Sequence, residues 1–179
     1  MTITKRRMGL APTLSVVSFL FFVLVIGVPA VRSQQPFQIV GCSSGKVVTI
    51  SESDLLTIYN ITGKGVAWST AGAKAFDNLI WDFAAILRVA GGETIGMGYY
   101  KFTDPDGDYF ILEATGNAIV EGGTWKVLTG TGKWKGILAK LKGKFILRGK
   151  PLSEETEQYW CRAIGTIELP GRVESWRSS

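Results

Sequence analysis

The side chains best suited to chemistry are charged and aromatic residues that stand within apolar stretches. Asp82, Arg88 and Glu113 lie among apolar residues, and burying such groups is costly unless they are paired. With aromatic neighbours they would line a mostly apolar cavity with few polar groups, the usual form of a small-molecule site. The candidate pocket residues on this hypothesis are Trp81, Asp82, Arg88, Tyr99, Tyr100 and Glu113. The alternative is that strand alternation turns the charged residues outward into water.

Several familiar catalytic and metal sites are excluded by residue type and spacing. The chain contains no histidine, which excludes Ser-His and Cys-His nucleophiles and every histidine-ligated metal. Gly130-Thr131-Gly132-Lys133 is no phosphate loop, because Val127 and Trp134 stand where a glycine and a Ser or Thr are needed. The acidic run from Asp104 to Asp108 lacks the later glutamate and flanking helices of an EF-hand, so it predicts a hairpin turn. We expect no metal and no cofactor.

The first 33 residues have the pattern of a secretory signal peptide. Basic residues at positions 5–7 precede an apolar run at 14–28, and Ala30 or Ser33 offers a small residue for cleavage. The apolar run is shorter than the roughly 20 residues that span a bilayer. An uncleaved membrane anchor is the alternative, and it is the only membrane contact expected. Cleavage would make the mature protein secreted or periplasmic.

The charge balance changes when this segment is removed. Of the 20 basic residues four lie in the first 33 positions, so the remainder carries 16 basic and 15 acidic residues. A chain this close to neutrality gives no reason to expect a nucleic-acid partner. The remaining length suits one domain with one core.

Cys42 and Cys161 are the only cysteines. In an exported chain, two cysteines near opposite ends suggest one disulfide between Cys42 and Cys161. It would close a loop of about 120 residues, worth roughly 4–5 kcal/mol on the chain-entropy model. Lipidation of Cys42 is the other interpretation, but a polar stretch separates this residue from the apolar run.

Short alternating segments between glycines predict an all-β domain at 46–170, after an arm at 34–45 and before a polar tail at 171–179. The apolar run 79–90 predicts a long bent strand, with a helix as the alternative. About eight strands are expected, in an antiparallel barrel or sandwich, and a closed barrel would remove exposed edges.

One hairpin is the clearest element. Trp125, Val127 and Thr129 alternate with polar or outward positions, Gly130-Thr131-Gly132 supplies a turn, and a lysine-bearing strand follows. The lysines between 126 and 150 could bind an acidic surface, or they could be solvated outward positions that also block edge pairing.

The same hairpin carries a family resemblance. Gly130-Thr131-Gly132-Lys133-Trp134-Lys135-Gly136-Ile137 resembles the Gly-Gly-Thr/Ser-Gly-x-aromatic-x-Gly hairpin of allene oxide cyclases and dirigent proteins, and of bacterial exported proteins of unknown function. Phe76-Asp77-Asn78 is similar to a Phe-x-Asn element of the cyclases. The resemblance implies a calycin-like, eight-stranded antiparallel barrel with an apolar cavity, often trimeric, in which Asn78 would help to hold a water. Ala75 stands where the cyclases have proline, and no motif matches their catalytic glutamate.

Three functions follow from these observations. The favoured one is an exported barrel that binds a small apolar molecule, or a partner surface, without catalysis. The second is an isomerase or cyclase in which a pocket carboxylate and a tyrosine do acid/base work. The third is an interaction protein that uses the lysine face. A homo-oligomer, trimer or dimer, is compatible with each.

Overall fold

A computed structural model describes residues 32–117, 123–150, 153 and 155–170. The predicted polar tail and nearly all of the predicted signal peptide lie outside these residues. Within the described part, no helix has the length and apolar character needed to cross a bilayer.

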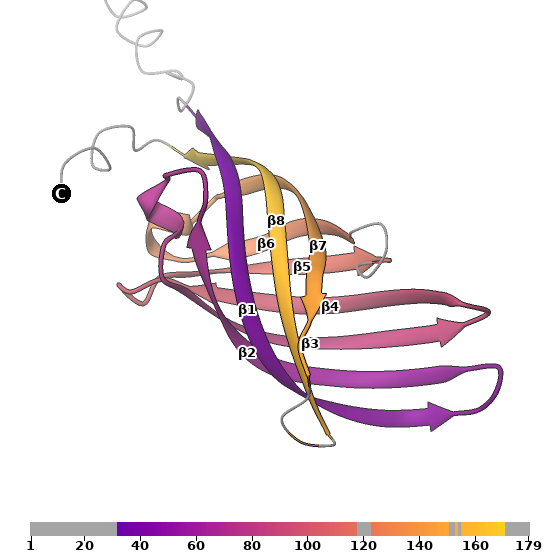
Figure 1. The fold of residues 1–179 in the computed structure, drawn as a ribbon. Helices are drawn as coiled ribbons and strands as arrows, with labels where there is room; N and C mark the ends of the chain where they lie inside the picture. The colour runs from indigo at the N-terminus through magenta and orange to yellow at the C-terminus, as the bar shows by residue number, and fades with distance from the viewer. Residues whose placement is uncertain (1–31, 118–122, 151–152, 154, 171–179) are drawn as a thin grey trace, which may run out of the picture. The chain divides into compact units, whose positions relative to one another are not determined.

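Eight antiparallel strands close into a barrel, each pairing with the next and the last pairing with the first (Figure 1). This confirms the predicted eight-stranded antiparallel β-barrel, and the run 79–90 is a strand rather than a helix. The strands are β1 (Arg32–Glu52), β2 (Thr57–Ser69), β3 (Leu79–Ala90), β4 (Glu93–Thr103), β5 (Tyr109–Gly116), β6 (Gly123–Gly130), β7 (Leu138–Arg148) and β8 (Thr156–Pro170).

The first strand is longer than the sequence suggests. Residues 34–45, expected as an arm, belong to β1 and pair with β8 on one side, and from Ile39 also with β2 on the other. The reason is alternation, because Phe37 and Ile39 are buried while Gln34 and Pro36 are exposed. The exposed residues between them make the segment look non-regular in sequence, although its inner face is apolar.

Strand alternation separates an inner from an outer face all round the barrel. On β3, Trp81 is 2% exposed whereas the preceding Ile80 is 53% exposed.

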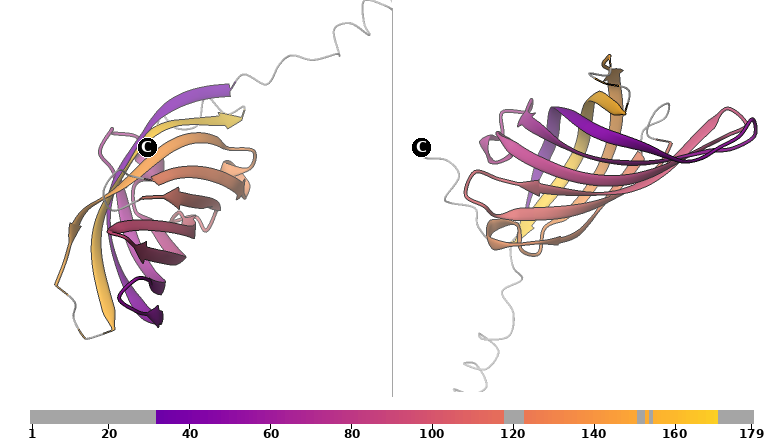
Figure 2. Two further views of the ribbon diagram at one scale, coloured as in Figure 1. Left: turned by 90° about the vertical axis from the view of Figure 1, so that its right-hand side faces the viewer. Right: turned by 90° about the horizontal axis from the view of Figure 1, so that it is seen from below.

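Strands β5 and β6 have 8 residues each, against 12 in β3 and 11 in β4. Figure 2 shows the β1–β2 and β3–β4 hairpins extending together beyond the ends of the shorter strands.

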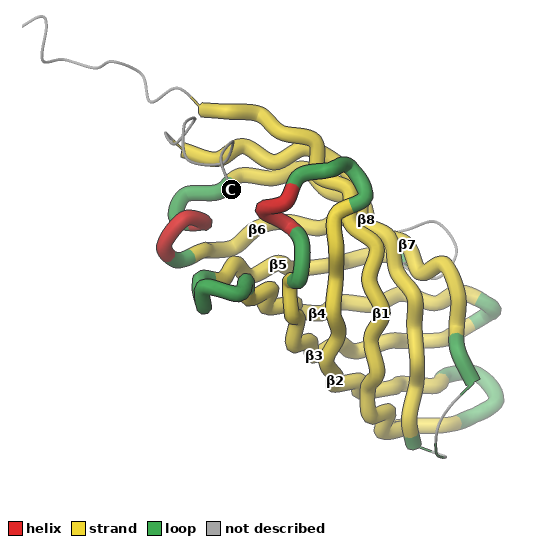
Figure 3. The backbone as a smooth tube through the Cα atoms, turned by 60° about the vertical axis from the view of Figure 1, so that its left-hand side comes forward, coloured by secondary structure: helices red, strands yellow, loops and turns green. Residues whose placement is uncertain are grey.

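One end of the barrel is closed by aromatic side chains. Two 3-10 turns, Lys74–Phe76 and Gly132–Trp134, lie together at this end (Figure 3). Phe76 stacks on Trp134 with ring centroids 5.5 Å apart, and Phe37 meets Phe76 edge-on at 4.9 Å. The turn expected at Gly130-Thr131-Gly132 is therefore part of a longer connection, because the chain must carry Trp134 into the core.

A buried ion pair holds this closed end. The Asp104 carboxylate is fully buried, lies 2.7 Å from the Lys133 ammonium and accepts a 2.8 Å hydrogen bond from Trp134 Nε1. Lys133 also pairs with Asp106 at 2.8 Å. Asp104 to Asp108 form the predicted hairpin turn, closed by a bond from Asp104 N to the Asp108 carbonyl. The ion pair thus ties the β4–β5 turn to the β6–β7 connection.

Both partners are held in their charged forms. Burial raises the pKa of Asp104, but hydrogen bonds from Lys133 and Trp134 and the lysine charge outweigh burial and bring this pKa below its usual value. Burial lowers the pKa of Lys133, but the bonds to Asp104 and Asp106 outweigh it and raise this pKa. The stabilisation from Asp104 is therefore present above pH 3.8, its unfolded value, and is lost as pH falls through the folded pKa.

We expect Asp104→Asn to lower the free energy of unfolding by about 2–3 kcal/mol at pH 7, since it removes one charge of a buried pair. Urea unfolding measures this, and the gap from wild type should shrink as the pH falls below about 4. Asp82→Asn is the matched control, because the Lys64–Asp82 pair is solvent-exposed and should cost under about 1 kcal/mol. Equal losses in both variants would contradict a structural role for the buried pair.

Candidate functional site

Towards the other end of the barrel, large rings of strands β3 and β6 lie against glycines of other strands. Trp81 of β3 covers Gly41 of β1 and Gly65 of β2, and a Cβ at either glycine would overlap the indole ring. Trp125 of β6 covers Gly143 of β7 in the same way. The missing side chains leave room for flat rings against the wall, a close approach that only glycine permits.

The rings of Phe83, Tyr100 and Trp125 form a stacked layer across the barrel. Phe83 and Tyr100 stack with ring centroids 5.5 Å apart and an interplanar angle of 13°. Tyr100 and Trp125 follow at 5.3 Å and 16°. Strands β3, β4 and β6 supply them, with β5 between the last two, so the layer is a product of tertiary structure. Stacked pairs of this kind add about 0.5–1.5 kcal/mol each to the gain from burial.

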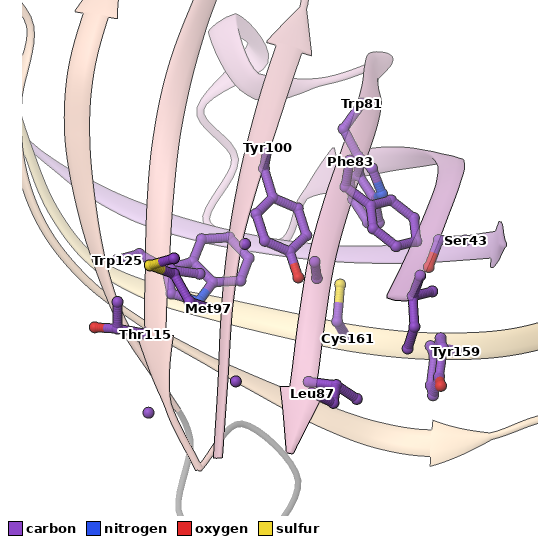
Figure 4. Close-up of a pocket in the computed structure, with 16 residues that line it drawn as sticks. Ser43, Trp81, Phe83, Leu87, Met97, Tyr100, Thr115, Trp125, Tyr159 and Cys161 are labelled. Atoms are coloured by element: carbon purple, nitrogen blue, oxygen red, sulfur yellow. The ribbon is translucent and has the colours of Figure 1, made fainter. Parts of the chain in front are cut away.

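A cavity opens beside this layer. The cavity has a volume of about 50 Å³, and the wider empty space around it, which includes open solvent, amounts to about 740 Å³. None of the described residues that line it is charged (Figure 4). The lining residues are Ser43, Ile61, Trp81, Phe83, Ala85, Leu87, Gly96, Met97, Gly98, Tyr100, Ala114, Thr115, Gly116, Trp125, Tyr159 and Cys161.

Two titratable groups in the cavity wall, Tyr100 and Cys161, are held neutral. Burial, with a smaller contribution from Cys161, raises the pKa of the Tyr100 hydroxyl far above its usual value. Burial, with a smaller contribution from Cys42, raises the pKa of the Cys161 thiol to about 12. Figure 4 shows the Tyr100 hydroxyl, the Cys161 thiol and the Ser43 hydroxyl around the same space. At neutral pH the wall therefore presents weak proton donors and no charge.

One polar atom in the wall lacks a partner. The Nε1–H group of Trp81 is buried, and no described atom accepts a hydrogen bond from it. An unpaired buried donor of this kind costs about 1–3 kcal/mol.

The sequence-predicted pocket residues divide between the two faces of the barrel wall. Trp81 and Tyr100 line the cavity. Tyr99 is 45% exposed and Arg88 is exposed, whereas Asp82 pairs with Lys64 at 2.8 Å. None of these three lines the cavity.

The remaining two candidates lie elsewhere. Glu113 is half-buried and stands opposite Tyr99 on β4 and Lys126 on β6. Asn78 has φ 58° and is exposed just before β3. Neither belongs to the cavity lining. Lining residues that the sequence reasoning missed include Ser43, Phe83, Tyr159 and Cys161. The sequence did indicate Phe83, because it lies two residues after Trp81 and so faces the same side of the strand.

The predicted disulfide is absent, since Cys42 and Cys161 are both free thiols. Register explains why. Cys161 stands opposite Gly41 and lines the cavity, whereas Cys42 stands opposite Trp160 and lines a groove on the other side of the wall. Successive strand residues point to opposite faces, so the two Cβ atoms point apart and cannot be bridged without backbone movement.

Among the described residues, no group of three or more acidic or cysteine side chains could hold a metal ion. The acidic turn is occupied by the Lys133 ammonium, which contacts Asp104 and Asp106.

A Cys42→Ser variant leaves Cys161 as the only thiol, and we expect iodoacetamide to alkylate it at least ~30-fold more slowly in the folded protein than in denaturant at pH 8. A pKa raised from 9.0 to about 12 lowers the thiolate population ~1,000-fold, and the higher nucleophilicity of the more basic thiolate recovers roughly half of this on a logarithmic scale.

Mass spectrometry of timed samples gives both alkylation rates. Cys161→Ser, which retains the partly exposed Cys42, is the control for reagent activity under folded conditions. Similar alkylation of Cys161 in folded and unfolded protein would show that this thiol does not lie in the barrel wall.

The chain matches no protein-family model and no curated protein sequence. Among solved structures it is similar to the pterocarpan synthase dirigent protein GePTS1, with 12% identity, a TM-score of 0.48 and coverage of 80% of this chain and 98% of that one. The pterocarpan synthase dirigent protein PsPTS1 is similar at 11% identity and a TM-score of 0.48, covering 78% and 97%. Dirigent proteins are one of the families that the hairpin sequence resembles.

Proposed function

We propose that this barrel binds a small, flat, apolar molecule in the cavity beside the Phe83–Tyr100–Trp125 layer and does not transform it. The observation that carries the proposal is the composition of the wall, which is aromatic and aliphatic with no charged lining residue among those described. Such a surface gains from excluding water, at roughly 25 cal/mol per Å² of apolar area.

The size of the cavity limits the ligand. Drug-sized ligands occupy pockets of roughly 300–1,000 Å³, whereas this cavity has a volume of only about 50 Å³. A ligand would insert one edge into the cavity, against the aromatic rings. The rest of it would lie in the mouth, where Met97 and Thr115 are exposed.

Binding without catalysis fits the chemistry of the wall better than an isomerase or cyclase does. General acid/base catalysis is most efficient when the pKa of the catalytic group lies near the working pH. Tyr100 and Cys161 both have raised pKa values, which hold them in their protonated forms at neutral pH. The candidate carboxylates for such a role, Asp82 and Glu113, do not line the cavity.

Export remains part of the proposal. A secreted or periplasmic carrier or sensor of apolar molecules would meet its ligand outside the cytoplasm, in keeping with the signal-peptide pattern of the first 33 residues.

Substitutions at two neighbouring alanines of β3 test whether the ligand binds in the cavity. Ala85 lines it, whereas Ala84 is exposed on the outer face. We expect Ala85→Leu to weaken binding of the neutral fluorophore N-phenyl-1-naphthylamine by roughly tenfold or more, a loss of about 1.4 kcal/mol, because the larger side chain occupies the ligand's space.

Fluorescence titration of each folded variant measures the effect, and Ala84→Leu should bind as wild type does. Equal binding by all three proteins would place the probe outside the barrel and contradict the proposal. Native mass spectrometry of protein purified from its own secretory compartment would also show any retained compound by its mass.

A further inference from the structure

We propose that a groove between β6 and β7 binds an extended acidic segment of a partner protein, which adds to the barrel as an extra strand. The groove shares no lining residue with the aromatic cavity. The inference therefore goes beyond the proposed function and does not depend on it. It assigns a second binding surface, on the outer side of the barrel wall, with a partner of defined charge.

Strands β6 and β7 pair over only a short stretch of their length. Their ladder has three residue pairs and ends where Trp125 lies opposite Leu141. Within residues 126–130 all strand pairing is with β5, and within residues 138–140 it is all with β8. Each strand thus has a stretch whose second edge forms no ladder with a described strand. The backbone N–H and C=O groups along such an edge can pair with an added strand.

The groove lies where this ladder has ended, and its volume is about 340 Å³. Pockets that hold ligands have volumes of roughly 300–1,000 Å³, so there is room here for side chains of a partner. Val127 and Ala139 are half-buried in it and pack against the hydrophobic core. The lining residues are Gln34, Lys126, Val127, Leu138, Ala139, Lys140, Thr166 and Glu168.

The charge on the groove defines the partner. Lys126 of β6 and Lys140 of β7 are exposed, and neither ammonium group is paired with a described acidic residue. Among the described lining residues Glu168, which is half-buried, is the one acid. Outward residues of an added strand would lie opposite the lysines, where opposite charges attract and like charges repel. The groove therefore favours a strand with Asp or Glu at outward positions and small apolar residues facing Val127 and Ala139.

The same charges argue against two other occupants. If a second copy of the barrel paired through the same groove, lysine would face lysine, which is unfavourable. The segments outside the described residues at either end of the chain are basic as well. Residues 1–31 contain three basic residues and no acid, and residues 171–179 contain two arginines and one glutamate. A partner of opposite charge is therefore the occupant that fits the groove.

A fluorescently labelled peptide of alternating glutamate and valine tests the charge requirement, and fluorescence anisotropy gives its dissociation constant. We expect Lys126→Glu combined with Lys140→Glu to weaken binding by roughly tenfold or more, because attraction across the groove becomes repulsion. Lys46→Glu combined with Lys101→Glu is the matched control. It makes the same change in net charge at exposed lysines of β1 and β4, and it should change the dissociation constant by less than about twofold at physiological salt, where distant charges are screened.

A second peptide, methylated on every backbone nitrogen, separates strand addition from simple charge attraction. It keeps the side chains and their charges but cannot donate backbone hydrogen bonds, so it should bind the wild-type protein at least about tenfold more weakly. This comparison needs no variant, and it holds even if the lysine variants do not fold.

Three results would overturn the inference. Equal binding of the two peptides would show a patch of positive charge rather than a strand-binding edge. No binding of the unmethylated peptide to the wild-type protein, or equal loss in the groove variant and its control, would exclude the groove as the site. Native mass spectrometry covers the remaining occupant, since a dimer that Lys126→Glu with Lys140→Glu alters would assign the groove to a second copy of the chain.

Discussion

The structure depends on the pairing of large aromatic rings with glycines across the barrel wall. A closed barrel of this size has a narrow interior, and side chains must fill it without overlap. Strands β1, β2 and β7 contribute glycines where β3 and β6 contribute tryptophans, so that Trp81 covers Gly41 and Gly65 while Trp125 covers Gly143. Without these glycines the rings could not lie against the wall, and neither the aromatic layer nor the cavity beside it would exist in this form.

The two ends of the interior have different physical characters. At the closed end a buried carboxylate is satisfied by Lys133 and by the Trp134 indole, so charge is used there to join two loops. At the cavity end no lining residue is charged, and the Trp81 indole nitrogen is without a protein acceptor among the described atoms. Two tryptophans with the same donor group thus have opposite environments. A satisfied donor contributes to the fold, whereas an unsatisfied buried donor costs about 1–3 kcal/mol.

The distribution of charge in the barrel also bears on the choice between binding and catalysis. The ion pair of Asp82 on β3 and Lys64 on β2 lies where water reaches it. In the cavity wall, Tyr100 and Cys161 are held in their protonated forms by burial. Such a wall can recognise shape and one or two hydrogen-bond acceptors. Neither of these two groups is poised to exchange protons with a substrate near neutral pH, which supports the proposal that the barrel binds a molecule without transforming it.

Period-two alternation, glycine punctuation and the hairpin before Ile137 are local properties, so the sequence by itself determined the strands, their antiparallel order and a barrel or sandwich. Which face of each strand lies inside is set by closure, because one residue of phase exchanges every inward and outward side chain. The choice of inner face directed Asp82 and Arg88 away from the cavity and brought Phe83 and Cys161 into its wall. It also placed Cys42 and Cys161 on opposite faces. The partner of Lys133 was equally undetermined, since Asp104 is distant in sequence and only the tertiary structure brings the two loops together.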